Sequence, residues 1–395
     1  MTQGAVVVGA HANGLGVIRA LGRHGIPIVS ISTRPFDIAH HSRFVTAHHP
    51  LPEFHARHET LVELLEANAG RWTGWCVYPT NDDAMSTLAQ HHERLSRSYR
   101  LPVQPWETVR HIVDKDLMDA LARGAGVALP RCYGPATDET AARGDLRYPL
   151  LVKPIQHDRL ISRFRAKLFL AHDAAELRAA VARLAEADST GLVYEFIPGG
   201  DSDIYVYCVY MDGAGEPSPG ITVRKLRQNP PFIGGARAAA IAPTEPALRE
   251  ATVELLRRAG FRGMAFAEFK RDRRDGRFLF IEVNGRAVLF NSVMPPTGVD
   301  LVTMTWSDFA LGERPRAIPT GWNGAWVHLQ AELLCAVRHR KTERLGIGEL
   351  LAPYRRPLRF GDWSASDPGP FLAQSGLAVR DTLSDWGRRL TNGRR

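Results

Sequence analysis

Two apolar runs on either side of residue 273 constrain the fold of this chain more than any other feature of its sequence. Residues 264–270 (MAFAEFK) and 277–284 (RFLFIEVN) are rich in aromatic and aliphatic side chains, and the polar segment between them ends in Asp275-Gly276. An Asp-Gly pair between two such runs is typical of a β-hairpin turn. The stretch therefore predicts two antiparallel strands joined by a short loop.

The predicted hairpin carries two carboxylates whose relation depends on the length of the loop. Glu282 and Asn284 are two residues apart on one strand, so they point to the same face of the sheet. A three-residue loop, 274–276, would pair Glu268 directly with Glu282, whereas a two-residue loop would place them on opposite faces. We expect the odd-numbered loop, with Gly276 at a positive φ.

Paired carboxylates need a cation or an open solvent face. Two of them about 5 Å apart repel by roughly 3 kcal/mol at an effective dielectric constant of about 20. Two carboxylates and an amide oxygen are hard ligands that suit Mg²⁺ bridging nucleotide phosphates. The alternative is a pair of solvent-facing glutamates, and Phe266, Phe278 and Phe280, which we expect on the same face, argue against it.

Arg286 follows the second strand after one glycine. Its guanidinium can hold a carboxylate or stabilise negative charge that develops beside a metal–phosphate site. The alternative is an ordinary surface arginine, because 50 of the 395 residues are Lys or Arg.

The rest of the chain alternates strand and helix patterns, which predicts an α/β (α+β) fold. The first hundred residues predict a parallel sheet covered on both faces by helices. Strands are expected at 5–8, 28–31, 75–78, 148–154, 191–196 and 204–211, and a helix at 174–187.

Composition excludes some classes of protein. No apolar stretch approaches the ~18 residues of a membrane-spanning helix. The N-terminus lacks a secretory-signal pattern, and four scattered cysteines without a CxxC pair disfavour a structural zinc site and suit a reducing cytoplasm. The net charge of +8 permits nucleic acid, an acidic membrane or a phosphorylated ligand, and does not choose among them.

The hairpin resembles the metal-binding hairpin of the ATP-grasp superfamily of ligases. The resemblance lies in Ala-Glu268-Phe-Lys and Phe-Ile-Glu282-Val-Asn284-Gly-Arg286. It implies that Glu268, Glu282 and Asn284 bind Mg²⁺ (with Mn²⁺ as an alternative) on ATP, and that Arg286 acts catalytically at the reacting phosphate.

Further ATP-grasp features follow in the family's order along residues 109–291. The resemblance implies phosphate-binding lysines, a hinge that recognises adenine and an acid that binds ribose; these are Lys115 and Lys153, then Glu195, Phe196 and Ile197, then Asp203. One departure is that residues 155–167 contain no glycine where many members have a glycine-rich phosphate loop. They carry Arg159, Arg163, Arg165 and Lys167 instead, of which Lys167 is the best candidate to cover the phosphates.

The resemblance also predicts the domain organisation. An N-terminal α/β (pre-ATP-grasp) domain is expected at 1–105 and a two-lobed ATP-grasp domain at 106–312, with lobes at about 106–200 and 201–312. Residues 313–395 remain as a basic, helical C-terminal extension that holds 14 basic and 8 acidic residues. Within it, the spacing of Trp326, Leu329, Leu333, Leu334 and Val337 predicts an amphipathic helix.

The activity implied is ATP-dependent ligation of a carboxylate to an amine through an acylphosphate, on an amino acid or small peptide. Candidate substrate-binding residues are Arg224, Lys225, Arg227, Asn291 and Ser292, and a basic surface turn is the alternative for the first three. The partners expected are small molecules; a membrane is not expected, nucleic acid is disfavoured, and a homodimer is left open.

Three other functions compete with a ligase. The glycines of GAHANGLG, residues 9–16, do not have the GxGxxG spacing of a dinucleotide-binding loop. The arginines and tryptophans of the extension would suit nucleic acid, although no recognised module is present. A domain that binds ATP without catalysis is disfavoured by the complete set of Glu268, Glu282, Asn284 and Arg286.

Overall fold

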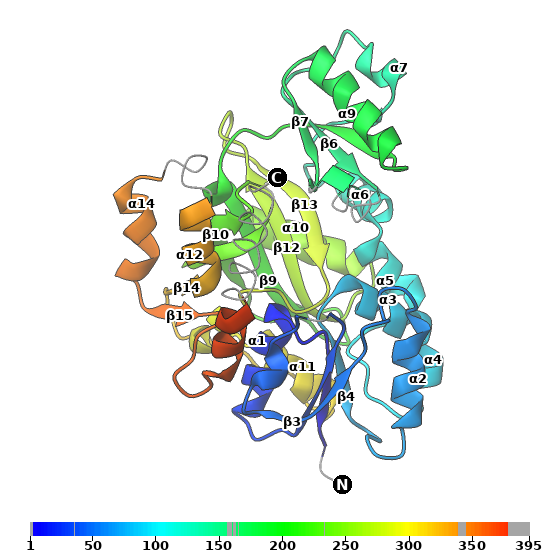
Figure 1. Cartoon of the computed structure of the whole chain (residues 1–395), viewed down its shortest axis with the longest axis vertical. Coiled ribbons are helices and arrows are strands. Elements are labelled where there is room, and N and C mark those ends of the chain that lie inside the picture. Colours follow the sequence, from blue (N-terminus) through cyan, green and yellow to red (C-terminus); the bar gives the residue numbers. More distant parts are fainter. Residues whose placement is uncertain are drawn as a thin grey trace, which may run out of the picture.

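The computed structural model describes residues 3–34, 36–155, 160, 163–164, 166–232, 234–338 and 345–377, and the side chains of residues 336–338 lie outside this description. The described strands form three sheets, two of four strands and one of seven. In Figure 1 the large sheet lies in the middle of the molecule, the N-terminal sheet lies below it, and a small lobe projects at the top.

The N-terminal sheet is parallel, in the order β3-β2-β1-β4, as the alternation of strands and helices predicts. Its strands are β1 (Ala5–Val8), β2 (Ile28–Ser32), β3 (Val45–Pro50) and β4 (Cys76–Pro79). Its helices are α1 (Ala12–Gly22), η1 (Ala39–His41), α2 (Glu59–Ala67), α3 (Asp82–Gln90) and α4 (His92–Leu95). Because β1 and β4 are neighbours and lead directly into α1 and α3, the N-termini of these two helices meet at one edge of the sheet.

The small lobe is an antiparallel sheet with a hydrophobic core of its own. Two helices, α5 (Trp106–Val113) and α6 (Lys115–Gly124), precede it. The lobe contains β5 (Cys132–Pro135), α7 (Asp138–Ala141), β6 (Leu150–Pro154), β7 (Phe169–Ala171), α9 (Ala174–Glu186) and β8 (Gly191–Glu195), with the strands in the order β5-β8-β6-β7. Leu150, Val152, Leu177, Leu184 and Val193 form part of its core.

The large sheet has the order β13-β12-β9-β10-β11-β14-β15 and is antiparallel except between its last two strands. Its strands are β9 (Ile204–Met211), β10 (Ile221–Asn229), β11 (Gly235–Ala242), β12 (Gly263–Arg271), β13 (Phe278–Asn284), β14 (Ala325–Val327) and β15 (Leu358–Phe360). Its helices are α10 (Pro246–Arg258), α11 (Leu301–Phe309), α12 (Leu329–Arg338) and α14 (Ile347–Leu351). Short 3-10 turns complete it: η2 (Asp201–Asp203), η3 (Asn291–Val293), η4 (Pro295–Thr297) and η5 (Ala352–Arg355).

Two hydrophobic cores join the N-terminal sheet to the large sheet. One combines Val6 and Val77 with Val209, Ala265 and Phe269. The other packs residues of β1 and α1 against β9, β10, β11, α11 and Trp326. The small lobe, by contrast, is packed around separate residues. The N-terminal and large sheets therefore form one packed body among the described residues, from which the small lobe projects (Figure 1).

The predicted amphipathic helix from Trp326 begins later than expected. Trp326 is fully buried on strand β14 and pairs with Ala239 on the adjacent strand β11, so a large side chain lies next to a small one. The carboxylate of Asp362 accepts hydrogen bonds from the backbone N–H groups of Leu329 (2.9 Å) and Gln330 (2.8 Å), where α12 begins. The prediction of a helix at Trp326 is therefore wrong, because a cap from a distant residue places the helix start at Leu329.

Two strands within the predicted extension, β14 (Ala325–Val327) and β15 (Leu358–Phe360), are part of the large sheet. The predicted boundary at residue 312 therefore does not separate them from the strands before it. No helix in the described part of the chain is long and apolar enough to span a membrane.

Residues 361–367 tie the large sheet to the N-terminal sheet. The carboxylate of Asp367 accepts three hydrogen bonds, each of 2.8 Å, from Arg19 Nε, Ser42 Oγ and the backbone N–H of Arg43. The guanidinium of Arg19 also donates to the carbonyl oxygens of Gly361, Asp362 and Asp367. Both charged side chains are almost fully buried, so this segment is a structural link between the two sheets.

Candidate active site

The hairpin predicted from the sequence is present and brings the two glutamates together. β12 and β13 are antiparallel, and Glu268 lies directly opposite Glu282. Gly276 in the loop has the predicted positive φ, 78°. The pairing expected for a two-carboxylate metal site is therefore confirmed in the register of the strands.

The length of the loop differs from the prediction. Arg271 pairs with Phe278, so an even number of residues separates the last paired residues of the two strands. The prediction of an odd-numbered loop is wrong. A bulge at Ile281 supplies the one-residue offset instead, because Glu268 pairs with Glu282 while the next residue, Phe269, pairs with Phe280.

The bulge also changes which aromatic side chains share a face with the glutamates. Phe280 pairs with Phe269, their ring centroids 5.5 Å apart, on the opposite face of the hairpin from Glu268. Phe278 follows the same register and contacts Tyr205 there. The prediction that Phe278 and Phe280 shield the glutamates is wrong, whereas Phe266, two residues before Glu268 on an unbroken stretch of strand, is buried on the predicted face.

The carboxylates already interact with cations and amides of the protein. Lys225 Nζ lies 2.6 Å from Glu268 Oε2, and both side chains are largely buried. Burial raises the pKa of the Glu268 carboxyl, and the charge of Lys225 opposes that rise. Asn284 Nδ2 lies 3.4 Å from Glu282 Oε1, so the third predicted ligand is next to the exposed carboxylate of Glu282.

The donor set suits a hard divalent cation that nucleotide phosphates also bind. Among the described residues, no three His, Cys, Asp or Glu side chains are grouped to hold a metal by themselves. Two carboxylates and an amide oxygen leave room in an octahedral shell for phosphate and water oxygens, as Mg²⁺ prefers. The chemistry of Glu268, Glu282 and Asn284 therefore fits Mg²⁺ bound together with a nucleotide.

The two predicted phosphate lysines lie near each other, and both contact the ring of Tyr194. Lys115 Nζ and Lys153 Nζ are 5.4 and 5.3 Å from the centre of the Tyr194 ring. Lys115 Nζ also donates to the carbonyl oxygen of Ile281, the bulge residue of the hairpin, at 3.3 Å. Burial, with the nearby charge of Lys115, lowers the pKa of Lys153 to about 8, and the two hairpin glutamates oppose this. Tyr194 was not singled out in the sequence, although it directly precedes Glu195.

The predicted adenine hinge lies between the small lobe and the hairpin loop. The Glu195 carboxylate accepts from Arg274 at 2.5 Å, and the Glu195 backbone N–H donates to the carbonyl of Arg131 at 2.8 Å. Lys270 Nζ lies 5.1 Å from the centre of the Phe196 ring, and Ile197 is 3% exposed. These contacts place Glu195 and Phe196 beside the hairpin.

The predicted ribose acid is also engaged by the hairpin loop. Asp203 Oδ2 accepts from Arg273 Nε at 2.7 Å and from the Gly200 backbone N–H at 2.8 Å. Arg273 and Arg274 were not predicted as functional residues. The signal for them was the density of arginine in the loop RDRRDGR, which gave no indication of their partners.

The arginine-rich segment after β6 is described only in part. Lys167 is exposed just before β7. Arg163 is exposed, with a guanidinium nitrogen 3.9 Å from Glu186. Arg159 and Arg165 lie outside the described residues. The prediction that this segment covers the phosphates therefore stays a prediction.

Arg286 connects the hairpin to the N-terminal sheet. Its Nε and one terminal nitrogen each lie 2.7 Å from a different oxygen of Asp82, which is a bidentate pair. Asp82 is the first residue of α3, beyond the carboxyl end of β4. The 14% exposed Arg286 side chain is therefore oriented by a carboxylate that lies 204 residues earlier in the sequence.

The residues predicted to bind substrate do not form one cluster. Arg224 donates to the carbonyl of Ser202, Lys225 pairs with Glu268, and Arg227 Nε pairs with Glu332 of α12 at 2.7 Å. The pairing of β10 with β11 is irregular at residues 225–228, and the side chains of these three basic residues contact different parts of the protein. Of the three, Lys225 directly contacts a predicted metal ligand.

The other two predicted substrate residues lie under the N-terminal helix α1. Ser292 Oγ accepts from Trp326 Nε1 at 2.9 Å. Asn291 Oδ1 accepts from the backbone N–H of Val288, while its Nδ2 is buried without a hydrogen-bond partner among the described residues. A Cβ on Gly16 would lie 3.2 Å from the Cβ of Asn291, so α1 packs closely against this residue.

The loop before α1 places a neutral histidine near Arg286. His11 Nδ1 accepts from the backbone N–H of Asn13 as the helix cap, and Nε2 lies 3.2 Å from Thr80 Oγ1. Burial, with the charges of Arg34 and Arg286, lowers the pKa of His11 to about 4. Protonation of Nδ1 would remove the cap acceptor, so the geometry and the pKa both keep this ring neutral.

This geometry predicts a pH dependence of stability. The unfolded chain binds a proton at His11 near pH 6.5 and the folded chain near pH 4, so the contribution of His11 is present above pH 6.5 and lost as the pH falls toward 4. We expect His11→Asn, which can still cap α1, to flatten the fall in the free energy of unfolding across this window. Urea unfolding at a series of pH values measures it, and equal losses in both proteins would contradict the assignment.

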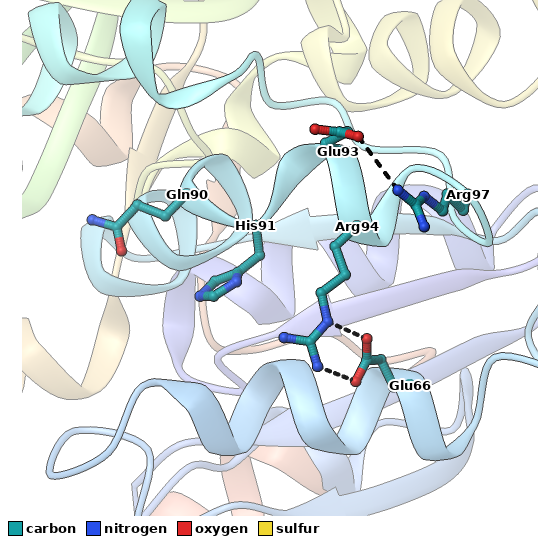
Figure 2. A pocket seen from close by; sticks show the side chains of 6 residues that line it. All are labelled: Glu66, Gln90, His91, Glu93, Arg94 and Arg97. Carbon is teal, nitrogen blue, oxygen red and sulfur yellow. Dashed lines mark hydrogen bonds and ion pairs between the residues drawn. The ribbon is translucent and has the colours of Figure 1, made fainter.

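A surface depression elsewhere on the molecule is separate from these residues. It is lined by Glu66, Gln90, His91, Glu93, Arg94 and Arg97, none of which is a predicted site residue (Figure 2). Arg94 faces Glu66 across it and Arg97 lies 3.3 Å from Glu93, so its charges largely pair with one another. We therefore place the candidate active site at the hairpin.

No family model and no curated protein matches this sequence, whereas solved structures match the fold. An L-amino acid ligase from Bacillus licheniformis has 17% identity and a TM-score of 0.60, over 78% of this chain and 74% of that chain. The biotin carboxylase domain of Hydrogenobacter thermophilus 2-oxoglutarate carboxylase, a dimer with MgADP, ADP and bicarbonate, has 20% identity and a TM-score of 0.61, over 82% and 74%. The ADP complex of PurK, an N5-carboxyaminoimidazole ribonucleotide synthetase, has 12% identity and a TM-score of 0.63, over 85% of each chain.

At these identities the likeness concerns the fold. The three matches cover 78%, 82% and 85% of this chain. The chain therefore has the fold of the ATP-grasp superfamily, as its sequence motifs predicted.

Proposed function

We propose that this chain is an ATP-dependent ligase that joins a carboxylate to an amine. The observation that carries the proposal is the direct pairing of Glu268 with Glu282 on a hairpin whose bulge contacts Lys115. A pair of carboxylates beside two lysines, one of them partly buried with a lowered pKa, is the arrangement that a metal-bound polyphosphate needs. The L-amino acid ligase among the structural matches agrees with an amino acid or small peptide as substrate.

Each part of ATP has candidate residues. Lys115 and Lys153 would bind the phosphates, with Lys167 as a further candidate. The hinge of Glu195, Phe196 and Ile197 would bind adenine, and Asp203 would bind ribose. In the free protein the Glu195 and Asp203 carboxylates pair with Arg274 and Arg273. Ribose binding at Asp203 therefore requires that the arginine share or release this carboxylate.

Glu268, Glu282 and Asn284 would hold Mg²⁺, with Mn²⁺ as an alternative. When bound there, the metal would neutralise phosphate charge during transfer. The substrate carboxylate attacks the γ-phosphorus of ATP, the bond to the bridging oxygen breaks, and ADP leaves with an acylphosphate remaining. The amine then attacks the acyl carbon, and phosphate leaves as the amide forms. Arg286, oriented by Asp82, would stabilise the negative charge of both steps.

A panel of amino acids and amines, scored by ADP and by phosphate release with product mass, tests the proposal. A ligase releases both only when a carboxylate and an amine are supplied together, and a new amide is found. Release of ADP with one substrate and a stable phosphorylated product would indicate a kinase instead. Binding of ATP without turnover across a broad panel would favour a domain that binds without catalysis.

The other expectations stay predictions. Nucleic acid is disfavoured as a partner. Salt-dependent binding to DNA or RNA would support that alternative, and the absence of binding even at low salt would end it. A homodimer stays open, and one of the matched structures, the biotin carboxylase domain from Hydrogenobacter thermophilus, is a dimer. The expectation of a cytoplasmic location rests on the scattered cysteines.

A further inference from the structure

Lys225 of β10 forms an ion pair with Glu268, a predicted metal ligand. Lys225 Nζ lies 2.6 Å from Glu268 Oε2, and 9% and 13% of the two side chains are exposed. An ammonium at this distance uses a lone pair of the carboxylate and places a full positive charge beside it. Nothing in the ATP-binding roles proposed above requires this contact.

The position of Lys225 is set by its neighbours. Lys225 Nζ also lies 3.4 Å from Gln228 Oε1. Asp201 accepts from the Gln228 backbone N–H at 2.7 Å and from Gln228 Nε2 at 2.9 Å, which fixes the amide oxygen of Gln228 toward the lysine. Gln228 and Lys225 are both buried. The ammonium is therefore held beside Glu268 by a chain of contacts that begins at Asp201.

A lysine held in this way competes with a metal. Mg²⁺ binds at short, fixed distances to its oxygens and keeps several waters, so it tolerates a crowded ligand poorly. A divalent cation near Glu268 would meet the charge of Lys225 in a partly buried environment, where screening is weak. A metal that arrives with the several negative charges of a nucleotide has the additional attraction needed to displace the ammonium.

We propose that Lys225 is a positioning residue that acts as an internal counter-cation, keeping Glu268 from binding a divalent cation until the nucleotide arrives with it. The inference rests on the proposed function, since it assumes that Glu268 is a ligand. It predicts that the site takes metal and nucleotide together and has little affinity for the metal alone.

The probe is Mn²⁺, measured on the full chain without nucleotide by the loss of the free-ion EPR signal, at mildly alkaline pH. We expect Lys225→Met to bind Mn²⁺ about tenfold more tightly than the unmodified chain, because one repelling charge and one competitor are removed. Lys225→Arg should bind as weakly as the unmodified chain. Lys225→Gln is a second neutral variant, and thermal unfolding confirms that each variant is folded.

Lys270→Met is a matched control. Lys270 is a partly buried lysine of β12, two residues after Glu268, and its ammonium lies over the Phe196 ring instead of on a hairpin glutamate. Its removal should leave Mn²⁺ binding without nucleotide unchanged. An increase equal to that of Lys225→Met would show that any loss of positive charge has the effect, and would overturn the specific role of Lys225.

Glu268→Gln separates this inference from the proposed function. If Glu268→Gln weakens Mn²⁺ binding with ADP while folded Lys225→Met and Lys225→Gln bind free Mn²⁺ no more tightly than the unmodified chain, the metal site stands and the role of Lys225 is overturned. If Glu268→Gln leaves Mn²⁺ binding with ADP unchanged, Glu268 is not a ligand and both proposals lose their basis. Tighter Mn²⁺ binding in the neutral variants alone, abolished when Glu268→Gln is added, is the supporting result.

Discussion

Replacing Glu282 by Gln should lower ADP release by about a hundredfold or more, because the substitution removes a charged metal ligand where phosphate charge must be neutralised. The fold should be retained. Glu282 is exposed and lies directly opposite Glu268, so the neutral side chain relieves a repulsion between like charges. Steady-state ADP release with the substrate pair found in the panel measures the first effect, and urea unfolding measures the second.

Two comparisons make this prediction specific. Glu250→Gln changes an exposed glutamate on α10, a helix that carries no predicted site residue, and should leave ADP release unchanged. A Glu282→Gln protein that unfolds at a lower urea concentration than the unmodified chain would mean that Glu282 has a structural role. Full ADP release by a folded Glu282→Gln protein would show that the metal assignment is wrong.

The sequence was sufficient to predict the pairing of Glu268 and Glu282, although the reason for the pairing was not predicted. Counting residues through an ideal hairpin requires an odd loop for this pairing. The protein instead has an even loop and a bulge at Ile281, and the two deviations give the same register. Such a bulge has no sequence signal, since Phe-Ile-Glu is an ordinary strand sequence. Its effect on Phe278 and Phe280, which lie on the opposite face, could not be predicted.

Contacts between residues far apart in the sequence explain most of what the sequence could not show. Arg286 was predicted as a catalytic residue from its position after β13. Its partner Asp82 is the first residue of α3, which packs with the N-terminal sheet. The start of α12 at Leu329 depends on Asp362, and no local pattern near Trp326 indicates that cap. Local patterns therefore predicted the type of most elements, while the partners of charged side chains required the fold.

One buried arginine could have been recognised from the sequence. Arg19 interrupts the apolar pattern of α1, in which Leu15, Val17, Ile18 and Leu21 are buried around it. A charged residue within such a pattern needs a buried partner of opposite charge. The partner, Asp367, lies 348 residues later and could not have been identified without the fold.

Breaking this pair should strongly destabilise the protein. In Asp367→Asn the guanidinium of Arg19, 3% exposed, loses its buried counter-charge, and we expect the free energy of unfolding to fall by about 3–5 kcal/mol. The same residue anchors Ser42 and the backbone of Arg43, so the link between the sheets is weakened at three contacts. Urea unfolding followed by tryptophan fluorescence measures the change.

We expect this large loss of stability because the Arg19–Asp367 pair is buried. An exposed ion pair provides the comparison. Glu93 and Arg97 are 94% and 74% exposed, and their separation is 3.3 Å, so Glu93→Gln should change the free energy of unfolding by less than about 0.5 kcal/mol. The double variant Arg19→Met with Asp367→Leu removes both buried charges and should be more stable than Asp367→Asn alone, because no unpaired charge remains. If Asp367→Asn costs no more than Glu93→Gln, residues 361–367 do not link the two sheets energetically. In that case the shared hydrophobic cores hold them together without the ion pair.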